Sequence, residues 1–222
     1  MKQIKLIIFD MDGVMTETSE QHYLAWKAMA KDIDIEIDRS FNEKLKGVSR
    51  MDSLNLILEY GNKIDKYSEE EKAALAAKKN KFYQDLIAHL TEKNLFEGML
   101  DLLKEIKKKK IKIALGSASR NAPTLLKAMN SMSYFDYIVN PKEIKKGKPH
   151  PDIFLKVAED LNIKPEEYIG VEDAIAGIES IKNAGMFAVG IGDPETLKKA
   201  DIVYIETKEF NLTEVLKKAV TI

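Results

Sequence analysis

The feature of this sequence that most constrains its fold is a short apolar segment, residues 4–9, which ends at two aspartates and a glycine. An apolar run of this length is typical of a buried strand and is too short for a helix. If the strand continues, Asp10 and Asp12 lie two positions apart and point to the same side. Two carboxylates placed there lose hydration and repel each other unless a cation or phosphate chemistry uses them. The alternative is that Asp12 and Gly13 only form a turn, and this segment by itself leaves both interpretations open.

The rest of the chain predicts an α/β core that is interrupted by an all-helical segment. Further strands, alternating with segments of helical spacing, are predicted at 111–115, 135–139, 167–171, 186–191 and 201–205. This alternation favours a Rossmann-like, doubly wound parallel sheet with right-handed crossovers. Residues 16–92 instead show helical spacing and no convincing strand. We therefore expect a core domain of residues 1–15 and 93–222, and an inserted all-helical cap domain of residues 16–92, with hinges near 14–18 and 90–96.

Local signals predict where several helices lie. Thr18 with Gln21 forms one candidate capping box, and Ser68 with Glu71 forms another, which leads into a long helix to about residue 90. Ser49 is the predicted N-cap of a helix with apolar residues at 54, 57 and 58. In the core, residues 194–200 are expected to form a helix between the last two strands.

Composition limits the classes of function. The 222 residues are 45% hydrophobic and 32% charged, which is ordinary for a globular protein with a sizeable core. The formal net charge of -1 gives no support for a nucleic-acid partner, and the lack of cysteine excludes disulfides and zinc sites built on thiolates. Apolar runs are far shorter than the ~20 residues that cross a bilayer, and the first one is too short for a signal peptide. We expect a cytoplasmic enzyme without a membrane partner, and a monomer, because no long exposed apolar segment is evident.

Polar side chains follow several of the predicted strands. In parallel sheets of this class, ligands bind beyond the carboxyl ends of the strands. The residues at these ends, or in the loop before the helix that leads to the fourth strand, are Asp10, Asp12, Ser117, Ser119, Lys148, Glu172 and Asp173. Each has a simpler explanation: the serines could cap a helix, the lysine could lie on the surface, and the two later acids could belong to a helix N-terminus. Their common position at one rim favours a site over coincidence.

Four motifs carry a resemblance to a known family. In chain order they are DMDGV at 10–14, the serine-bearing end of the second strand, KPHPD at 148–152 and VEDAIAGI at 171–178. Together they resemble the haloacid dehalogenase superfamily and cover most of the core. The cap segment LKGVSR at 45–50 and the sequence around His22 and Trp26 are similar to phosphomutases of that superfamily, over nearly the whole chain. Such enzymes convert β-D-glucose 1-phosphate to glucose 6-phosphate through a β-glucose 1,6-bisphosphate intermediate, using magnesium.

The resemblance implies roles for the acids at the rim. Asp10 would be the nucleophile that forms an aspartyl phosphate, and Asp12 would be the general acid and base for the sugar hydroxyl. Mg²⁺ would be held by an Asp10 oxygen, the Asp12 backbone carbonyl and Asp173. Glu172 would support the metal, directly or through water.

The resemblance also implies which residues contact the sugar phosphate. The implied phosphate-binding residues are Ser117, Lys148, Arg50, Ser119 and Asn121. The implied substrate-binding residues are His22, Trp26, Lys46, Gly47, Val48, Ser49, Lys79, Ala118 and Arg120, with Asn80 beside them. Arg50 suits bidentate recognition of the distal phosphate. Judged without the resemblance, Trp26 fits the core or rim of the cap better than a stacking role, and His22 fits a structural or surface residue.

Two alternative functions remain open at this stage. A sugar-phosphate phosphatase of the same superfamily would share every core motif, and the cap segment at 45–50 favours the mutase. A non-catalytic module that only accepts phosphate on Asp10 would need neither Asp12 nor a cap able to enclose a sugar.

Glu17 stands where close relatives usually carry Asp, one methylene shorter, in the hinge. The Lys148–Pro149 peptide bond is expected to be trans, as most X–Pro bonds are.

Overall fold

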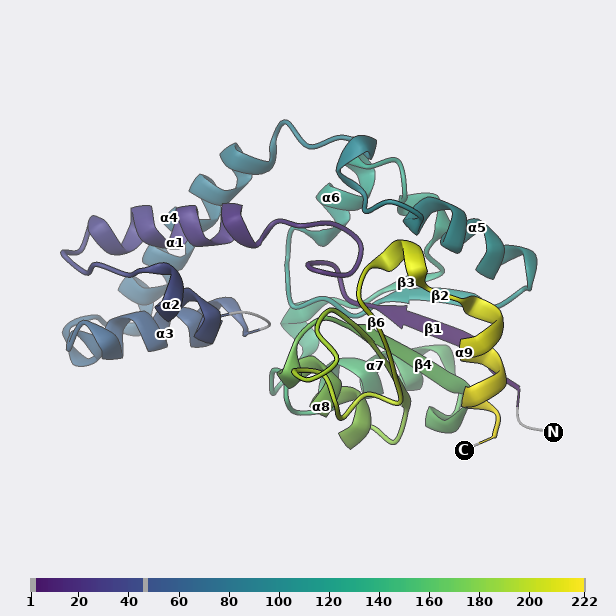
Figure 1. Ribbon diagram of the computed structural model, residues 1–222. Coiled ribbons are helices and arrows are strands. Elements are labelled where there is room, and N and C mark those ends of the chain that lie inside the picture. The colour runs from purple at the N-terminus through teal and green to yellow at the C-terminus, as the bar shows by residue number, and fades with distance from the viewer. Residues whose placement is uncertain (1–2, 46–47, 222) are drawn as a thin grey trace. The chain divides into compact units, whose positions relative to one another are not determined.

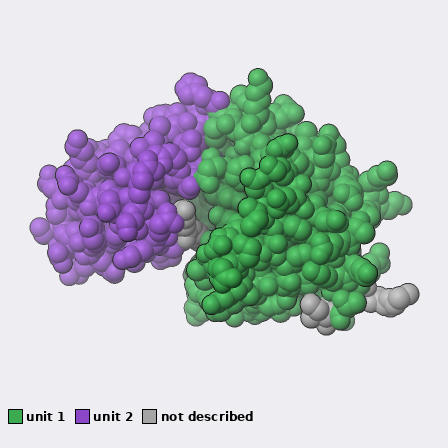
Figure 2. All heavy atoms as spheres, in the orientation of Figure 1, with its two compact units in different colours: residues 1–17, 90–222 green, residues 18–89 purple. Residues whose placement is uncertain are grey.

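The computed structural model describes residues 3–45 and 48–221, and the chain divides into two compact units (Figure 2). One unit comprises Met1–Glu17 together with Leu90–Ile222, and the other comprises Thr18–His89. The first unit contains the strands, and the second is helical. Among the described residues, no helix has both the length and the apolar character needed to cross a bilayer.

The first unit is built on a parallel sheet. Its strands within the described chain are β1 (Leu6–Phe9), β2 (Lys112–Leu115), β3 (Tyr137–Ile138), β4 (Tyr168–Glu172), β5 (Phe187–Ile191) and β6 (Ile202–Tyr204). They are ordered β3-β2-β1-β4-β5-β6, and every neighbouring pair is parallel. The prediction of a Rossmann-like, doubly wound α/β fold is confirmed.

Helices cover both faces of this sheet. They are α5 (Met99–Lys108), α6 (Ala122–Ala128), α7 (Asp152–Leu161), α8 (Ile175–Asn183) and α9 (Leu212–Ala219). On one face Leu6 and Ile8 share a buried cluster with Phe154 of α7 and Ile181 of α8. Figure 1 shows α5 on the opposite side of the sheet from α8. Because β1 is buried on both faces, its sequence is a continuous apolar run without alternation.

The second unit has a hydrophobic core of its own. Its helices are α1 (Ser19–Lys31), α2 (Arg39–Asn42), α3 (Arg50–Tyr60) and α4 (Glu69–Ile87). Trp26 of α1 and Leu54 of α3 belong to one buried cluster. The predicted capping box of Ser68 and Glu71 is confirmed at the start of α4, and Ser49 caps α3 as predicted. Each cap satisfies backbone N–H groups that the first helical turn leaves without intrahelical partners.

Three local predictions were wrong. Thr18 makes no side-chain cap for α1, because its hydroxyl shares a hydrogen bond of 2.9 Å with the hydroxyl of Tyr83 in α4. Residues 194–200 form turns instead of a helix, with Leu197 N donating to Asp193 O and Ala200 N donating to Leu197 O. The first of these hydrogen bonds spans four positions of the chain and the second spans three. A helix propagates by repeating one such spacing, so this mixture forms turns. The Lys148–Pro149 peptide bond is cis.

The two segments where the chain leaves and re-enters the first unit lie side by side. Phe96 N donates to Met15 O at 2.8 Å, and the Thr16 hydroxyl donates to Asn94 O at 2.6 Å. Thr16 and Leu95 form an antiparallel bridge. Hydrogen bonds therefore hold the two segments together within this unit.

Candidate active site

The sheet order places the end of β1 beside the end of β4. Strands β2 and β3 lie on one side of β1, and β4 to β6 lie on the other, so the connections diverge between β1 and β4. In open α/β sheets, ligands bind at this point of divergence. Asp10 follows β1, and its backbone N–H donates to Val171 O of β4 at 3.0 Å. Glu172 ends β4 and Asp173 follows it, so acids from the two strands meet at one rim.

Lys148 joins two of these acids. Its Nζ donates to Asp10 Oδ1 at 2.7 Å and also pairs with Glu172 Oε1. The lysine side chain is only 2% exposed, so the alternative of a surface lysine is wrong. Burial lowers the pKa of Lys148, but the two carboxylates outweigh burial and raise the pKa above its ordinary value. The lysine therefore carries its positive charge inside the site.

Glu172 is fixed by the start of the following helix. Its Oε2 accepts from the backbone N–H groups of Asp173 at 3.0 Å and Ala174 at 3.2 Å. Burial raises the pKa of Glu172, against the effect of Lys148, which lowers it. Gly177 in α8 packs on this carboxyl group, since a Cβ there would lie 1.9 Å from Glu172 Cδ. The sequence does signal this role, because glycine inside a helix costs stability and needs a packing reason.

The acid cluster, defined as Asp10, Lys148, Glu172 and Asp173, can hold a cation. Carboxylate oxygens of Asp10, Glu172 and Asp173 lie within 4.8 Å of one another. Burial, followed by the charges of Glu172 and Asp10, raises the pKa of Asp173 to about 9. A divalent cation would offset this repulsion, and oxygen donors are the ligands that Mg²⁺ prefers. The three carboxyl groups therefore fit a magnesium site.

Asp12 lies in a tight turn beside the acid cluster. The turn is closed by hydrogen bonds from Gly13 N to Thr16 O at 2.8 Å and from Met15 N to Met11 O at 2.9 Å. Gly13 has a φ of 72°, and a Cβ there would lie 2.0 Å from Asp173 Oδ2. A residue with a side chain would be strained at this φ and would also collide with the acid. The alternative that Asp12 and Gly13 form a turn is thus correct for the backbone. This turn places Asp12 next to the acid cluster.

The loop after β2 brings hydroxyl groups to the same rim. Gly116 N donates to Phe9 O at 2.8 Å, so Ser117 follows directly beside the end of β1. Ser117 Oγ is buried and accepts from Ser119 N at 3.1 Å, while Ser119 Oγ accepts from Asn121 N at 3.3 Å. Both hydroxyls thus accept from backbone N–H groups two residues further along the loop, and neither caps α6, whose N-cap Asn121 has no side-chain cap hydrogen bond. Each hydroxyl still has a proton to donate. Around them Ala118 is half-buried, Arg120 is exposed and Asn121 is buried.

In the helical unit, His22, Trp26, Lys79 and Tyr83 form a second cluster, the cap cluster. Lys79 Nζ donates to His22 Nδ1 at 2.7 Å and lies 4.7 Å from the Trp26 ring centroid and 4.9 Å from that of Tyr83. Each pair, His22 with Trp26 on α1 and Lys79 with Tyr83 on α4, is spaced by one helical turn and shares a face. Trp26 is 3% exposed, so it belongs to the cap core.

The cap cluster keeps its imidazole neutral. Burial, and then the positive charges of Lys79 and Arg50, hold the pKa of His22 well below its ordinary value. Because Nδ1 accepts from an ammonium group, the proton of the neutral ring is placed on Nε2. His22 therefore carries no positive charge of its own near neutral pH.

The other implied contacts of the helical unit lie at the start of α3 and in α4. Arg50, the first residue of α3, donates to Asn80 Oδ1 at 2.8 Å. Ser49 caps α3 and donates to Asp52 Oδ2 at 2.6 Å, and both Val48 and Ser49 are half-buried. Lys46 and Gly47 lie outside the described residues.

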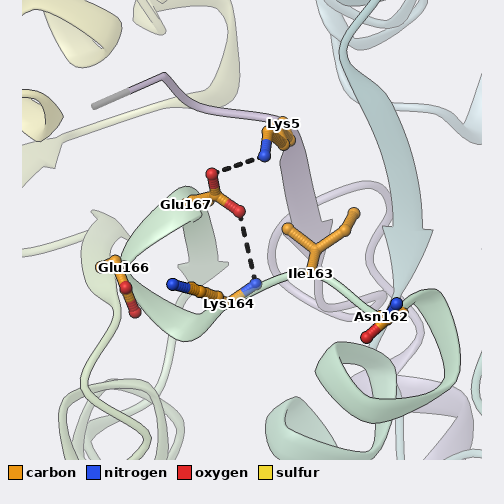
Figure 3. A pocket seen from close by; sticks show the side chains of 6 residues that line it. All are labelled: Lys5, Asn162, Ile163, Lys164, Glu166 and Glu167. Carbon is orange, nitrogen blue, oxygen red and sulfur yellow. Dashed lines mark hydrogen bonds and ion pairs between the residues drawn. The ribbon is translucent and has the colours of Figure 1, made fainter. Parts of the chain in front are cut away.

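A pocket elsewhere on the first unit contains none of the candidate residues. It lies where β1 and β4 begin, opposite the rim of the acid cluster, and its lining residues are Lys5, Asn162, Ile163, Lys164, Glu166 and Glu167 (Figure 3). Lys5 Nζ pairs with Glu167 Oε1 at 2.6 Å, and the other Glu167 oxygen accepts from Lys164 N at 3.4 Å. These contacts are those of an ordinary ion pair that ties a loop to the sheet.

The chain is similar to known proteins in sequence and in structure over nearly its whole length. β-Phosphoglucomutase of Bacillus subtilis is 47% identical over 94% of this chain and 92% of its own length. A phosphorylated carbohydrates phosphatase of Thermotoga maritima is 29% identical over 96% of this chain and 99% of its own length. The crystal structure of β-phosphoglucomutase from Clostridium difficile matches with a TM-score of 0.96 at 45% identity, covering 99% of this chain and 98% of that one.

A family model gives the same placement and covers the site. The model for haloacid dehalogenase-like hydrolases matches residues 4–185. The matched range includes β1 with Asp10, the loop with Lys148 and the end of β4 with Asp173. Because the matched range contains the whole acid cluster and most of the chain, the chain belongs to the haloacid dehalogenase-like hydrolase family.

Proposed function

We propose that the protein is a phosphomutase that interconverts β-D-glucose 1-phosphate and glucose 6-phosphate. The observation that carries this proposal is the acid cluster, in which a buried lysine and three carboxyl groups meet where β1 and β4 diverge. The 47% identity to the Bacillus β-phosphoglucomutase over nearly the whole chain supports the choice of substrate. Phosphoryl transfer needs positioning and charge neutralisation above all, and this cluster is suited to both.

In this proposal Asp10 carries the phosphoryl group. Its carboxylate attacks a phosphorus of β-glucose 1,6-bisphosphate, the sugar oxygen leaves, and an aspartyl phosphate forms. The aspartyl phosphate then passes the group to the C6 hydroxyl of β-glucose 1-phosphate, which frees the carboxylate. The resulting β-glucose 1,6-bisphosphate returns its C1 phosphoryl group to Asp10 and leaves as glucose 6-phosphate. Lys148 and Ser117 would bind the oxygens of the group in transfer. Asp10, Asp173 and the Asp12 carbonyl, with support from Glu172, would hold Mg²⁺, which would supply positive charge beside the nucleophile and the group in transfer.

Asp12 is the proposed general acid and base. It would take the proton of the C6 hydroxyl during attack and protonate the C1 oxygen when that oxygen leaves. Asp12→Asn should still be phosphorylated at Asp10 by a reactive donor such as acetyl phosphate, whose leaving group needs no proton. Turnover of β-glucose 1-phosphate should fall by about 10²-fold or more. Equal turnover by Asp12→Asn would exclude this role.

The helical unit is proposed to bind the sugar and its distal phosphate. Arg50, which Asn80 holds, would bind the distal phosphate, and Lys79 and His22 would offer further donors. Binding there would favour a closed state that excludes water, because a mutase must deliver its phosphoryl group to a sugar hydroxyl in competition with water. We include the remaining implied contacts of Ser49, Val48 and the loop at 118–121 in this proposal.

The second candidate function is a sugar-phosphate phosphatase. The 29% identity to the Thermotoga phosphatase over nearly the whole chain favours it, since such an enzyme shares the same core chemistry. One assay separates the two: the purified protein is given β-glucose 1-phosphate, Mg²⁺ and a trace of β-glucose 1,6-bisphosphate as primer. The mutase predicts glucose 6-phosphate as the main product, whereas free phosphate in equal or larger amount would establish the phosphatase.

Location and assembly follow from the same proposal. Sugar phosphates are charged metabolites of the cell interior, so we propose a cytoplasmic enzyme. We also propose that it acts as a monomer, because each candidate residue lies within one chain. A mass from light scattering that matches two or more copies of the 25.2 kDa chain would contradict the second point.

A further inference from the structure

The turn that carries Asp12 is held from outside by the C-terminal part of the chain. The Thr207 hydroxyl donates to the backbone carbonyl of Val14 at 2.8 Å, across 193 positions of sequence. Thr207 is 5% exposed, and Val14 is fully buried. A carbonyl at this depth destabilises the fold if it loses its hydrogen-bond partner. The contact is therefore a specific anchor for the turn.

Thr207 is itself placed firmly. It begins a short 3-10 helix, Thr207–Glu209, shortly after β6, whose last residue accepts a hydrogen bond from Gly192 N at Tyr204 O, at 2.8 Å. On its other side Phe210 N donates to Thr207 O at 3.1 Å. The next residue, Lys208, packs with its backbone against Gly98, where an added Cβ would lie 2.9 Å from Lys208 Cα. The anchor thus connects the turn to the sheet and to the start of α5.

The anchored carbonyl lies within the turn that sets the position of Asp12. Val14 lies between Gly13 and Thr16, which close the turn through their own hydrogen bond, and Asp12 bridges to Thr16. Gly13, Asp173 and Thr207 also line one hollow of the first unit. Loss of the Thr207 hydroxyl would allow the turn to shift while leaving Asp10, Lys148 and Glu172 on their own strand ends and loop.

We infer that Thr207 is a positioning residue for Asp12, the proposed general acid and base. This inference rests on the proposed mutase function. Small displacements of a catalytic group are costly, since about 1 Å of misplacement can lower a rate about a hundredfold. The residue acts through the backbone of Val14.

The test compares two reactions that differ in their need for Asp12. Transfer from acetyl phosphate to Asp10 needs no general acid, because acetate is a good leaving group, whereas turnover of β-glucose 1-phosphate needs proton transfer at both sugar oxygens. Thr207→Val should lower kcat for β-glucose 1-phosphate about tenfold or more with little change in KM. Its rate of phosphorylation by acetyl phosphate at saturating Mg²⁺ should fall by much less than kcat, because that reaction does not use the Asp12 carboxyl, and Thr207→Ser, which keeps the donor, should restore kcat.

The matched control is Thr221→Val, since the Thr221 hydroxyl also donates to a backbone carbonyl, that of Lys218 at 2.7 Å, but in an exposed position. It should behave as wild type in both reactions. If Thr207→Val folds poorly, Thr207→Ala removes the same donor with a smaller side chain, and hydrogen exchange at the Met15 and Thr16 amides reports the looseness of the turn directly.

Three outcomes would overturn the inference. They are an equal loss in both reactions by Thr207→Val, an unchanged kcat for β-glucose 1-phosphate, and a failure of Thr207→Ser to restore kcat. A wild-type protein that makes no glucose 6-phosphate would instead overturn the proposed function itself. The wild-type and variant results therefore separate the two failures.

Discussion

The acid cluster and the cap cluster resist opposite kinds of charge. In the acid cluster, burial and neighbouring carboxylates raise the pKa of Asp173, so further negative charge is disfavoured. In the cap cluster, burial and neighbouring cations lower the pKa of His22, so further positive charge is disfavoured. The first environment favours a bound cation, and the second favours a bound anion. A magnesium ion and a phosphorylated sugar are ligands of these two kinds.

The largest expected effect comes from removing the nucleophile of the acid cluster. Asp10→Asn should lower kcat for β-glucose 1-phosphate about a thousandfold or more, because no aspartyl phosphate can form. Intact-protein mass spectrometry after acetyl phosphate treatment should show no added phosphoryl group. Asp101→Asn, an exposed acid on α5, serves as the control. A variant at position 10 that keeps a tenth of the activity would place the nucleophile elsewhere.

The substitution Arg50→Ala tests whether the helical unit binds an anion. If the helical unit favours anions because it binds the distal phosphate, the ratio of phosphate release to mutase turnover should rise roughly tenfold. Asn80→Ala should change the ratio in the same direction by less, because it removes the partner of Arg50 and keeps the charge. Arg39→Ala, which breaks an exposed pair with Glu20, should leave the ratio unchanged. An unchanged ratio in Arg50→Ala would remove Arg50 from this role.

The acid cluster should also make the metal-free protein sensitive to pH. The folded-state pKa of Asp173 is raised to about 9, so its contribution to stability is complete below its unfolded value and is lost as pH rises toward 9. Glu172 shifts in the same direction. Without Mg²⁺, the Tm should fall by several degrees between pH 5 and pH 9, and Asp173→Asn should flatten the fall. Saturating Mg²⁺ should remove most of it.

If the metal-free Tm instead rises over this range at the same rate in wild type and Asp173→Asn, the carboxylates do not oppose one another as described. Differential scanning calorimetry in buffers of equal ionic strength makes this measurement, because surface charge effects depend on salt.

The smallest expected effect concerns the imidazole of the cap cluster. Lys79→Met should raise the pKa of His22, since one of the neighbouring positive charges is removed. The pKa should stay below its ordinary value, because burial is the larger cause. NMR titration of the His22 ring signals measures the change, with Lys78→Met as a control from an exposed ion pair. A pKa of His22 that does not move would mean that the Lys79 charge is not felt at the ring.

The core was more predictable from sequence than the cap, and the reason is physical. The strands of the sheet are buried, so short apolar runs ending at polar residues mark their positions and their carboxyl ends. The order of these strands in the sheet cannot be read from local signals, because it depends on which connections cross over. For this reason the sequence predicts only that Lys148, Asp10 and Glu172 lie at one rim of the sheet. The direct contacts of Lys148 with the two acids come from the structure.

Two of the wrong predictions show that a local sequence signal does not decide a structure by itself. Thr18 has the spacing of a helix cap, but Tyr83, 65 positions away, takes its hydroxyl. Residues 194–200 have helical composition, yet Leu197 N and Ala200 N donate across four and three residues respectively, and the segment forms turns. The cap cluster was visible only through the resemblance, since the meeting of His22 with Lys79 depends on how α1 packs on α4.

The side-by-side arrangement of Thr16 with Leu95 has an evolutionary consequence. Since the chain leaves and returns at neighbouring points, the sheet needs only a short closure there, and the cost of closing a loop grows slowly with its length. An ancestral sheet protein could accept an inserted segment at this site, and exchange it for another, without rebuilding its strands. New substrate preferences could thus arise by replacing residues between positions 17 and 90, while the phosphoryl-transfer chemistry is inherited unchanged.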